Sequence, residues 1–165
     1  MADIRLVRID FRLIHGQVIT KWFGQTMANE IIIIDDMLSK DDFMSSIYTM
    51  SAPPGATVNV YSVDQAIKLW NENGLGNGKV LLLFKNVEQA YKTFNLGLPL
   101  PEIQIGGLGS APGRKVVYGP ITMDDIDAKM LKEMMDKGSH VYLHQVPEEG
   151  KIDFIKILEK YDFNV

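Results

Sequence analysis

Short apolar runs alternate along the chain with stretches whose apolar residues recur at helical spacing. Runs such as EIIIID and KVLLLF are dense in isoleucine, leucine and valine and show no polar alternation, which is typical of strands buried on both faces. The pattern predicts strands at residues 4–9, 30–35, 57–61, 79–84 and 102–105, with further strands at 115–118 and 139–146.

Helices are predicted between most of these strands. Residues 16–28 and 122–138 each carry apolar positions at the spacing of one helix face, and residues 151–161 form a last helix. Side chains that accept hydrogen bonds from a first helical turn predict where helices begin. The predicted N-caps are Ser39, Ser62, Asn86 and Thr122.

This alternation predicts an α/β fold, a single-domain open and mainly parallel sheet with helices on both faces. No repeat, low-complexity segment or linker interrupts residues 1–165, so we expect one domain. In open sheets of this kind, ligands bind in the loops that follow the carboxyl ends of strands. The loops predicted there are 10–16, 35–38, 85–86 and 106–114.

The first of these loops contains His15. The predicted helix begins directly after it, and the backbone N–H groups of Gly16, Gln17 and Val18 have no partner within the helix and favour an anion. Arg12 lies three residues before His15, and its planar guanidinium is suited to neutralising phosphate. A neutral imidazole is a nucleophile near physiological pH, so these residues suit a phosphohistidine site. The alternative is a loop histidine that only hydrogen-bonds the backbone.

Other polar residues give weaker signals. Asp35 and Asp36 end the second predicted strand, where they either hold Mg²⁺, orient Arg12, or start a solvated turn. His140 and His144 face one side of a predicted strand about 13 Å apart, which is too far to share an ion. The two histidines therefore do not form a metal site. We expect none at Asp35 and Asp36 either, because such a pair at a strand end more often begins a turn.

Two glycine-rich segments do not match nucleotide-binding loops. GLGNGK at 74–79 precedes a strand and lacks the Ser or Thr of a phosphate loop, and GGLGSAPGR at 106–114 lacks the dinucleotide fingerprint. The second segment is either a flexible wall beside the His15 loop, with Arg114 near an anion, or an ordinary loop. A nucleotide-dependent enzyme is disfavoured.

Composition narrows the classes of function further. Hydrophobic residues make up 46% and charged residues 23% of the 165, as in soluble globular domains. The net charge of −4 does not support nucleic-acid binding, and the absence of cysteine excludes disulfides and thiolate chemistry. Neither a secretory signal nor an apolar run of about 20 residues is present. We expect a cytoplasmic protein that can still dock onto a membrane protein.

The segment VRIDFRLIHGQVITKW at 7–22 resembles the active-site segment of the IIB component of the mannose/fructose/sorbose family (type 4) of the bacterial sugar phosphotransferase system. The resemblance extends over the whole chain. IIIIDD, KVLLLFKNVEQA and QVP at 145–147 fit family segments, as does EIQIGGLG, with Gln104 where the family usually has Asn. The RLIHGQ core is the specific part, and the other matches support it.

The resemblance implies that His15 is phosphorylated on Nδ1 by the IIA component. It also implies that the phosphoryl group passes to a sugar as the membrane components IIC and IID import it. Arg12 matches the arginine that helps to hold the phosphoryl group, and Asp10 matches the acidic residue before it. Gly16 and Gln17 match the residues that begin the helix under the phosphate. No cofactor is implied, and a cytoplasmic protein peripherally associated with the membrane transporter is expected.

One position departs from the family pattern. Phe11 stands where a second acidic residue is common, and it either offers an apolar contact to a partner or packs inward. The competing function is a non-catalytic α/β module that binds an anion or metabolite in the same crevice. The identity of the sugar is not encoded in a recognisable motif.

Overall fold

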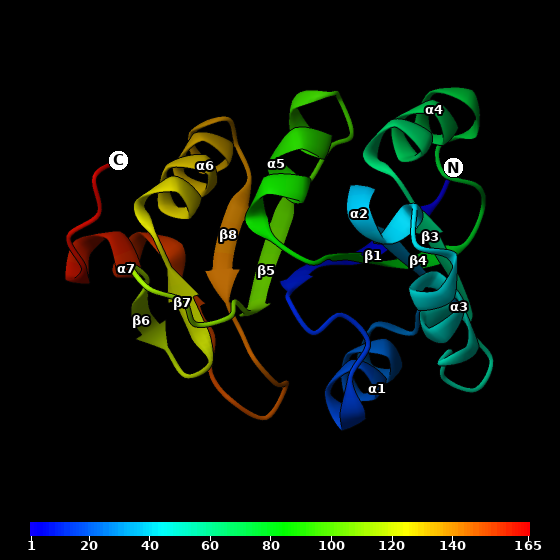
Figure 1. The fold of residues 1–165 in the computed structure, drawn as a ribbon, viewed down its shortest axis with the longest axis horizontal. Helices are drawn as coiled ribbons and strands as arrows, with labels where there is room; N and C mark the ends of the chain where they lie inside the picture. Colours follow the sequence, from blue (N-terminus) through cyan, green and yellow to red (C-terminus); the bar gives the residue numbers. More distant parts are fainter.

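The computed structural model describes residues 1–165 and has one continuous seven-stranded sheet at its centre (Figure 1). The strands lie in the order β3-β2-β4-β1-β5-β8-β9, and all neighbouring pairs are parallel except β8 and β9. Their bounds are β1 Asp3–Asp10, β2 Glu30–Ile34, β3 Thr57–Tyr61, β4 Lys79–Phe84, β5 Glu102–Gly107, β8 His140–Leu143 and β9 Ile152–Asp153. The predicted open, mainly parallel sheet is confirmed.

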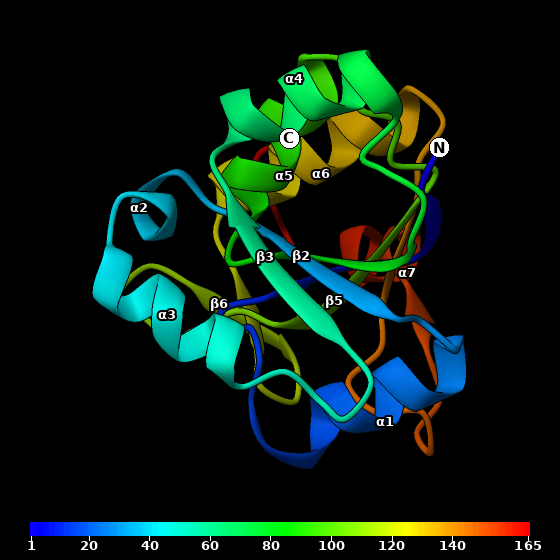
Figure 2. The same ribbon diagram turned by 90° about the vertical axis from the view of Figure 1, so that its right-hand side faces the viewer.

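Seven helices and a two-stranded hairpin surround the sheet. The helices are α1 Gly16–Thr26, α2 Asp36–Ser39, α3 Asp42–Met50, α4 Val63–Asn73, α5 Val87–Asn95, α6 Asp125–Asp136 and α7 Phe154–Lys160. The hairpin pairs β6 (Lys115–Tyr118) with β7 (Ile121–Met123). Figure 2 shows α4, α5 and α6 above the sheet and α1 and α3 below it. The prediction of helices on both faces is therefore confirmed.

Two hydrophobic cores form because the buried strands alternate between the faces. In β2, Ile32 and Ile34 point into the larger core beneath α4, α5 and α6, whereas Ile31 and Ile33 point into the smaller core under α1, α2 and α3. All four isoleucines are almost completely buried. The continuous apolar run of this strand thus serves both layers at once.

The connections diverge at the carboxyl end of β1. The chain leaves β1 for α1 on one face, whereas both neighbouring strands, β4 and β5, lead to elements on the other face. Such a switch in direction leaves a crevice at the strand ends, where ligands bind in open α/β sheets. The fold therefore presents the loop after β1 at its natural binding position.

Two of the predicted caps are confirmed and two are wrong. Ser62 forms a capping box with Gln65, and the Asn86 side chain accepts a hydrogen bond from the Gln89 backbone. Ser39 instead ends the short helix α2, and its hydroxyl donates to the Asp36 carbonyl.

The wrong caps share one cause. Asp41 caps α3 and Asp124 caps α6, while Thr122 lies inside β7. In both places a carboxylate closer to the helix accepts from the third helical residue, which leaves no capping role for the upstream hydroxyl. The structure also adds β9 at the start of the predicted last helix and ends the predicted strand 139–146 at Leu143. No helix combines the length and apolarity that crossing a bilayer requires.

Candidate functional site

A tight turn after β1 presents His15 at the start of α1. The Leu13 backbone N–H donates to the Asp10 carbonyl at 2.9 Å, and Leu13 adopts a left-handed conformation (φ 56°) with its side chain buried. The buried side chain offsets the cost of that backbone conformation by anchoring the turn in the smaller core. Gly16 also has a positive φ, and His15 occupies the N-cap position of α1 in an extended conformation.

The imidazole of His15 contacts a buried carboxylate. Its Nε2 lies 3.1 Å from Oδ2 of Asp10, which is completely buried, while the His15 side chain is 21% exposed. Burial raises the pKa of Asp10, but hydrogen bonds from Arg12 and the positive charge of Arg8 outweigh burial and hold this pKa below its usual value. An ionised carboxylate can only accept hydrogen bonds. Nε2 of His15 therefore carries the proton, and in the neutral ring Nδ1 keeps the free lone pair.

Arg12 hydrogen-bonds the same carboxylate from the solvent side. Its backbone N–H and its Nε each donate to Oδ1 of Asp10 at 3.0 Å, and its Nη2 donates to Oδ2 at 3.2 Å. The Arg12 side chain is 29% exposed, and its guanidinium lies 5.3 Å from the centre of the Phe11 ring. Phe11 is itself 38% exposed and packs beside Gly109, so it is part of the rim of the site.

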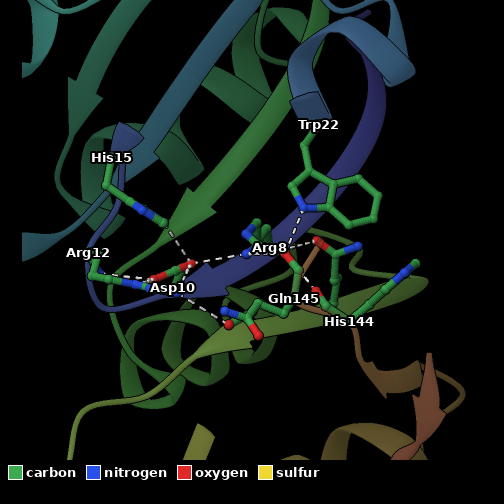
Figure 3. Close-up of polar contacts among 9 residues, drawn as sticks. Arg8, Asp10, Arg12, His15, Trp22, His144 and Gln145 are labelled. Carbon is green, nitrogen blue, oxygen red and sulfur yellow. Dashed lines mark hydrogen bonds and ion pairs between the residues drawn. The ribbon is translucent and has the colours of Figure 1, made fainter. Parts of the chain in front are cut away.

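Arg8 approaches Asp10 from inside the protein, and sequence reasoning missed it (Figure 3). Its side chain is 1% exposed, and it donates to Oδ2 of Asp10, to the side-chain oxygen of Gln104, and to the carbonyls of His144 and Gln145. Burial lowers the pKa of the guanidinium, and the charge of Asp10 opposes this change. The available signal was an arginine within an apolar strand, two residues before Asp10 and hence on the same face.

Two consecutive glycines in β5 make room for the arginines. A Cβ atom on Gly106 would lie 2.0 Å from Nη2 of Arg8, and one on Gly107 would lie 2.7 Å from Nη2 of Arg12. Gln104 precedes them, and its side-chain oxygen lies 2.5 Å from Nη1 of Arg8, whereas its nitrogen is buried without a partner. The glycine pair in EIQIGGLG is thus explained by the close approach of two guanidinium groups.

The structure separates Asp35 and Asp36 from this cluster. Asp35 caps α2 by accepting from the Leu38 backbone. Asp36 accepts from the Val63 backbone and from Lys92. Burial raises the pKa of Asp36, but these hydrogen bonds and the Lys92 charge hold it below its usual value. Both carboxylates thus have partners that organise α2 and its neighbours. Neither contacts Arg12, so the alternative in which they orient Arg12 is not supported.

Arg114 likewise lies in its own network. It donates to Thr122, Asp124 and Asp127, which fastens the loop after β5 to the start of α6. Burial raises the pKa of Asp127, although Arg114 opposes this effect. Residues 106–107 end β5, and the segment does lie beside the His15 loop, since the Phe11 backbone N–H donates to the Gly107 carbonyl. The hydrogen bonds of Arg114 go to α6 and the residues before it, and they favour a structural role for Arg114 over a place near the anion.

The remaining predicted residues, Gly16 and Gln17, open α1 and are exposed. Their backbone N–H groups belong to the first helical turn, where no carbonyl precedes them within the helix. A nucleophilic nitrogen, the exposed guanidinium of Arg12 and a helix N-terminus thus meet at the loop after β1, and the buried Arg8 holds the shared carboxylate from beneath. Such an arrangement can accept an anionic group on Nδ1 and neutralise it.

Comparisons with known proteins agree with this geometry. The family model described as the PTS system sorbose subfamily IIB component matches residues 4–165, where PTS denotes the phosphotransferase system. The sorbose-specific EIIB component of Lacticaseibacillus casei is 34% identical over 96% of this chain and 95% of its own. The mannose-specific EIIAB component of Escherichia coli K12 is 30% identical over 96% of this chain, but the chain spans only 49% of it, about half its length.

Solved structures give the same assignment. The crystal structure of manxB from Thermoanaerobacter tengcongensis superposes with a TM-score of 0.92 at 41% identity and covers 98% of each chain. The IIBSor domain of the sorbose permease from Klebsiella pneumoniae gives a TM-score of 0.91 at 29% identity, covering 98% of this chain and 99% of its own. The predicted family is therefore confirmed, and the chain belongs to the sorbose-subfamily IIB components of the sugar phosphotransferase system.

Proposed function

We propose that His15 is the residue through which this IIB phosphocarrier accepts a phosphoryl group and passes it on to a sugar. The observation that carries the proposal is the 3.1 Å contact between Nε2 of His15 and Oδ2 of Asp10. This contact holds the proton on Nε2 and leaves the Nδ1 lone pair free beside the N-terminus of α1. Arg12, Gly16 and Gln17 supply positive charge and backbone donors around the incoming group.

Acceptance is a transfer between two histidines. The Nδ1 lone pair attacks phosphorus in line with the donor's P–N bond, which breaks and returns its electron pair to the donor imidazole. Because Nε2 of His15 keeps its proton, the phosphorylated ring gains a formal positive charge, which the ionised Asp10 stabilises at hydrogen-bond distance. The protein supplies alignment and charge stabilisation, and no cofactor takes part.

Donation to the sugar depends on the same proton. When a sugar hydroxyl attacks the phosphoryl group, the N–P bond breaks and its electron pair returns to Nδ1. With Nε2 still protonated, the leaving group is a neutral imidazole, whereas without that proton it would be a strongly basic anion. The hydroxyl proton passes to a base or to solvent. Asp10 is thus a positioning residue for both half-reactions.

The expected partners follow from family membership. The phosphoryl donor is a IIA component, and the acceptor is a sugar bound by the membrane components IIC and IID. This makes the chain a protein-Nπ-phosphohistidine–sugar phosphotransferase that works in the cytoplasm at the surface of its transporter. The exposed rim around His15, with the half-exposed ring of Phe11, is suited to protein partners that dock in turn.

Phosphate transfer from a phosphorylated IIA component tests the proposal. We expect one phosphate per chain, labile in acid and stable in alkali, in the wild type and in the control variants His140→Ala and His144→Ala. His15→Ala should take up none. A wild type that stays unphosphorylated by every phosphorylated IIA tested, or an H15A variant that is labelled as well as the wild type, contradicts the assignment. An anion-binding module would instead bind its ligand equally well after His15→Gln.

A further inference from the structure

We infer that Arg8 is a positioning residue that keeps Asp10 neutralised, so that Arg12 can leave Asp10 and take hold of the phosphoryl group. The inference rests on the proposed role of His15 and assigns a different task to each of the two arginines. Both contact the same carboxylate in the unphosphorylated protein, but they do so from opposite sides and with very different exposure.

The charges of the site show why two arginines are needed. Arg8, Arg12 and Asp10 together leave one surplus positive charge beside the imidazole, whose nucleophilic form is neutral. A phosphoryl group on Nδ1 brings about two negative charges, while the ring with its retained Nε2 proton gains one positive charge. If only Arg12 were present, Asp10 and the phosphoryl group would compete for it. With Arg8 fixed on Asp10, Arg12 is free to pair with the phosphoryl group.

The contacts of Arg8 show that it stays in place. Its Nη1 and Nη2 groups donate to four acceptors at 2.5–3.0 Å, on Asp10, Gln104, His144 and Gln145. If this buried guanidinium moved away, several buried polar groups would lose their hydrogen-bond partners, which costs free energy. The Trp22 ring also lies 5.6 Å from this guanidinium, and its Nε1 donates to the same Gln145 carbonyl. Arg8 is therefore the fixed counter-ion.

The contacts of Arg12 show that it can move. Outside Asp10, its side chain has one long hydrogen bond of 3.5 Å, to the Gly106 carbonyl, and it lies against the Phe11 ring at the surface. Its backbone N–H also donates to Asp10, so the loop stays anchored when the side chain swings away. Exchange of a carboxylate for a phosphoryl group keeps a charge-assisted, bidentate partner throughout.

A double-mutant cycle on phosphoryl acceptance tests this division of roles. Arg12→Met alone should lower the rate of transfer from the phosphorylated IIA component by about 10²-fold, as expected for loss of one charge-stabilising donor. In an Arg8→Met background, the same change should lower the rate less than about threefold, because Arg12 there stays paired with Asp10 and does not reach the phosphoryl group. In an Arg8→Lys background, which restores the buried charge, the cost should return to tenfold or more. Equal costs of Arg12→Met in all backgrounds would overturn the inference.

A control separates this role from a structural one. Trp22→Phe removes the indole hydrogen bond to the Gln145 carbonyl and loosens the same loop without touching Asp10. In that background Arg12→Met should keep its full cost. A cost reduced as in Arg8→Met would show that loop order, and not the charge on Asp10, governs Arg12.

A measurement on the wild type covers the case in which Arg8→Met does not fold. In proton–nitrogen spectra of the arginine Nε–H groups, phosphorylation should shift the Arg12 signal strongly and leave that of Arg8 nearly unchanged. A shifted Arg8 signal with an unmoved Arg12 signal would refute the exchange. If the wild type accepts no phosphate on His15, the proposed function itself fails. If it does accept phosphate but the cycle is additive, only the role of Arg8 is wrong.

Discussion

Replacing Gly106 by alanine tests the buried arginine directly. A Cβ atom at this position would lie 2.0 Å from Nη2 and 2.1 Å from Cζ of Arg8, far inside contact distance. The end of an arginine side chain usually moves aside at little cost. Arg8 cannot, because it is 1% exposed and its guanidinium donates to four acceptors.

The expected loss of stability has two parts. Forcing an extra carbon into a packed interior costs about 1–3 kcal/mol. If the Arg8 guanidinium is displaced from Asp10, the stranded charge adds a further cost, since breaking a buried ion pair is worth about 3–5 kcal/mol. We therefore expect Gly106→Ala to lower the free energy of unfolding by at least ~3 kcal/mol. With a urea m-value of ~2 kcal/mol/M, the midpoint falls by at least ~1.5 M.

Gly109→Ala is the matched control for this experiment. A Cβ atom at Gly109 would approach the Phe11 ring at 3.4 Å, an ordinary contact at the rim of the site. Its midpoint in urea, followed by circular dichroism, should stay within ~0.5 M of the wild type. If Gly106→Ala unfolds at the same urea concentration as Gly109→Ala, Arg8 does not occupy the space above Gly106 and the description of the site is wrong.

Three further predictions concern the carboxylates and the rim. Since the folded-state pKa of Asp10 lies below its usual value, its contribution to stability is present above the unfolded pKa and is lost as pH falls through the folded one. The wild type should thus lose stability more steeply than Asp10→Asn below about pH 4 in acid unfolding, and equal slopes would refute this. Asp35→Ala should lower the melting temperature by a few degrees because it removes the acceptor that caps α2, with phosphoryl acceptance unchanged within about twofold; a tenfold slower transfer would restore its predicted role at the site. Phe11→Ala should raise KM for the phosphorylated IIA component several-fold with kcat nearly constant, because the ring is at the rim; a change confined to kcat would place the ring in the chemistry instead.

Much of the fold could be predicted because the buried strands carry an unambiguous pattern. Ile31 to Ile34 and Leu81 to Leu83 are apolar at every position, which is typical of a short strand covered on both faces. The helix starts were less predictable, because aspartates stand close to both wrong caps. Ser39 and Asp41 are both good N-cap residues, and the choice between them depends on where α2 ends and α3 begins.

The centre of the site was predictable from local order, but its buried half was not. Asp10 ends β1, and Arg12 and His15 lie in the loop directly after it, so their proximity follows from the chain itself. The role of Arg8 depends on carbonyls of residues 144 and 145 and on a missing Cβ at Gly106, and only the folded sheet brings these together.

The separation of Asp35 follows from its own loop. A carboxylate at a strand end is equally suited to a ligand or to a helix cap, and α2 begins immediately after it. That short helix was not predicted, and the role of Asp35 as its N-cap was therefore not predicted either.

In the proposed mechanism, Nδ1 of His15 carries the phosphoryl group while Nε2 keeps its proton, hydrogen-bonded to Asp10. Long-range proton–nitrogen spectra of the protein labelled with ¹⁵N-histidine, recorded before and after phosphorylation by a IIA component, test this directly. We expect only the His15 ring to change, with phosphate on Nδ1 and the proton retained on Nε2. Phosphate on Nε2 of His15, or on His140 or His144, would contradict it.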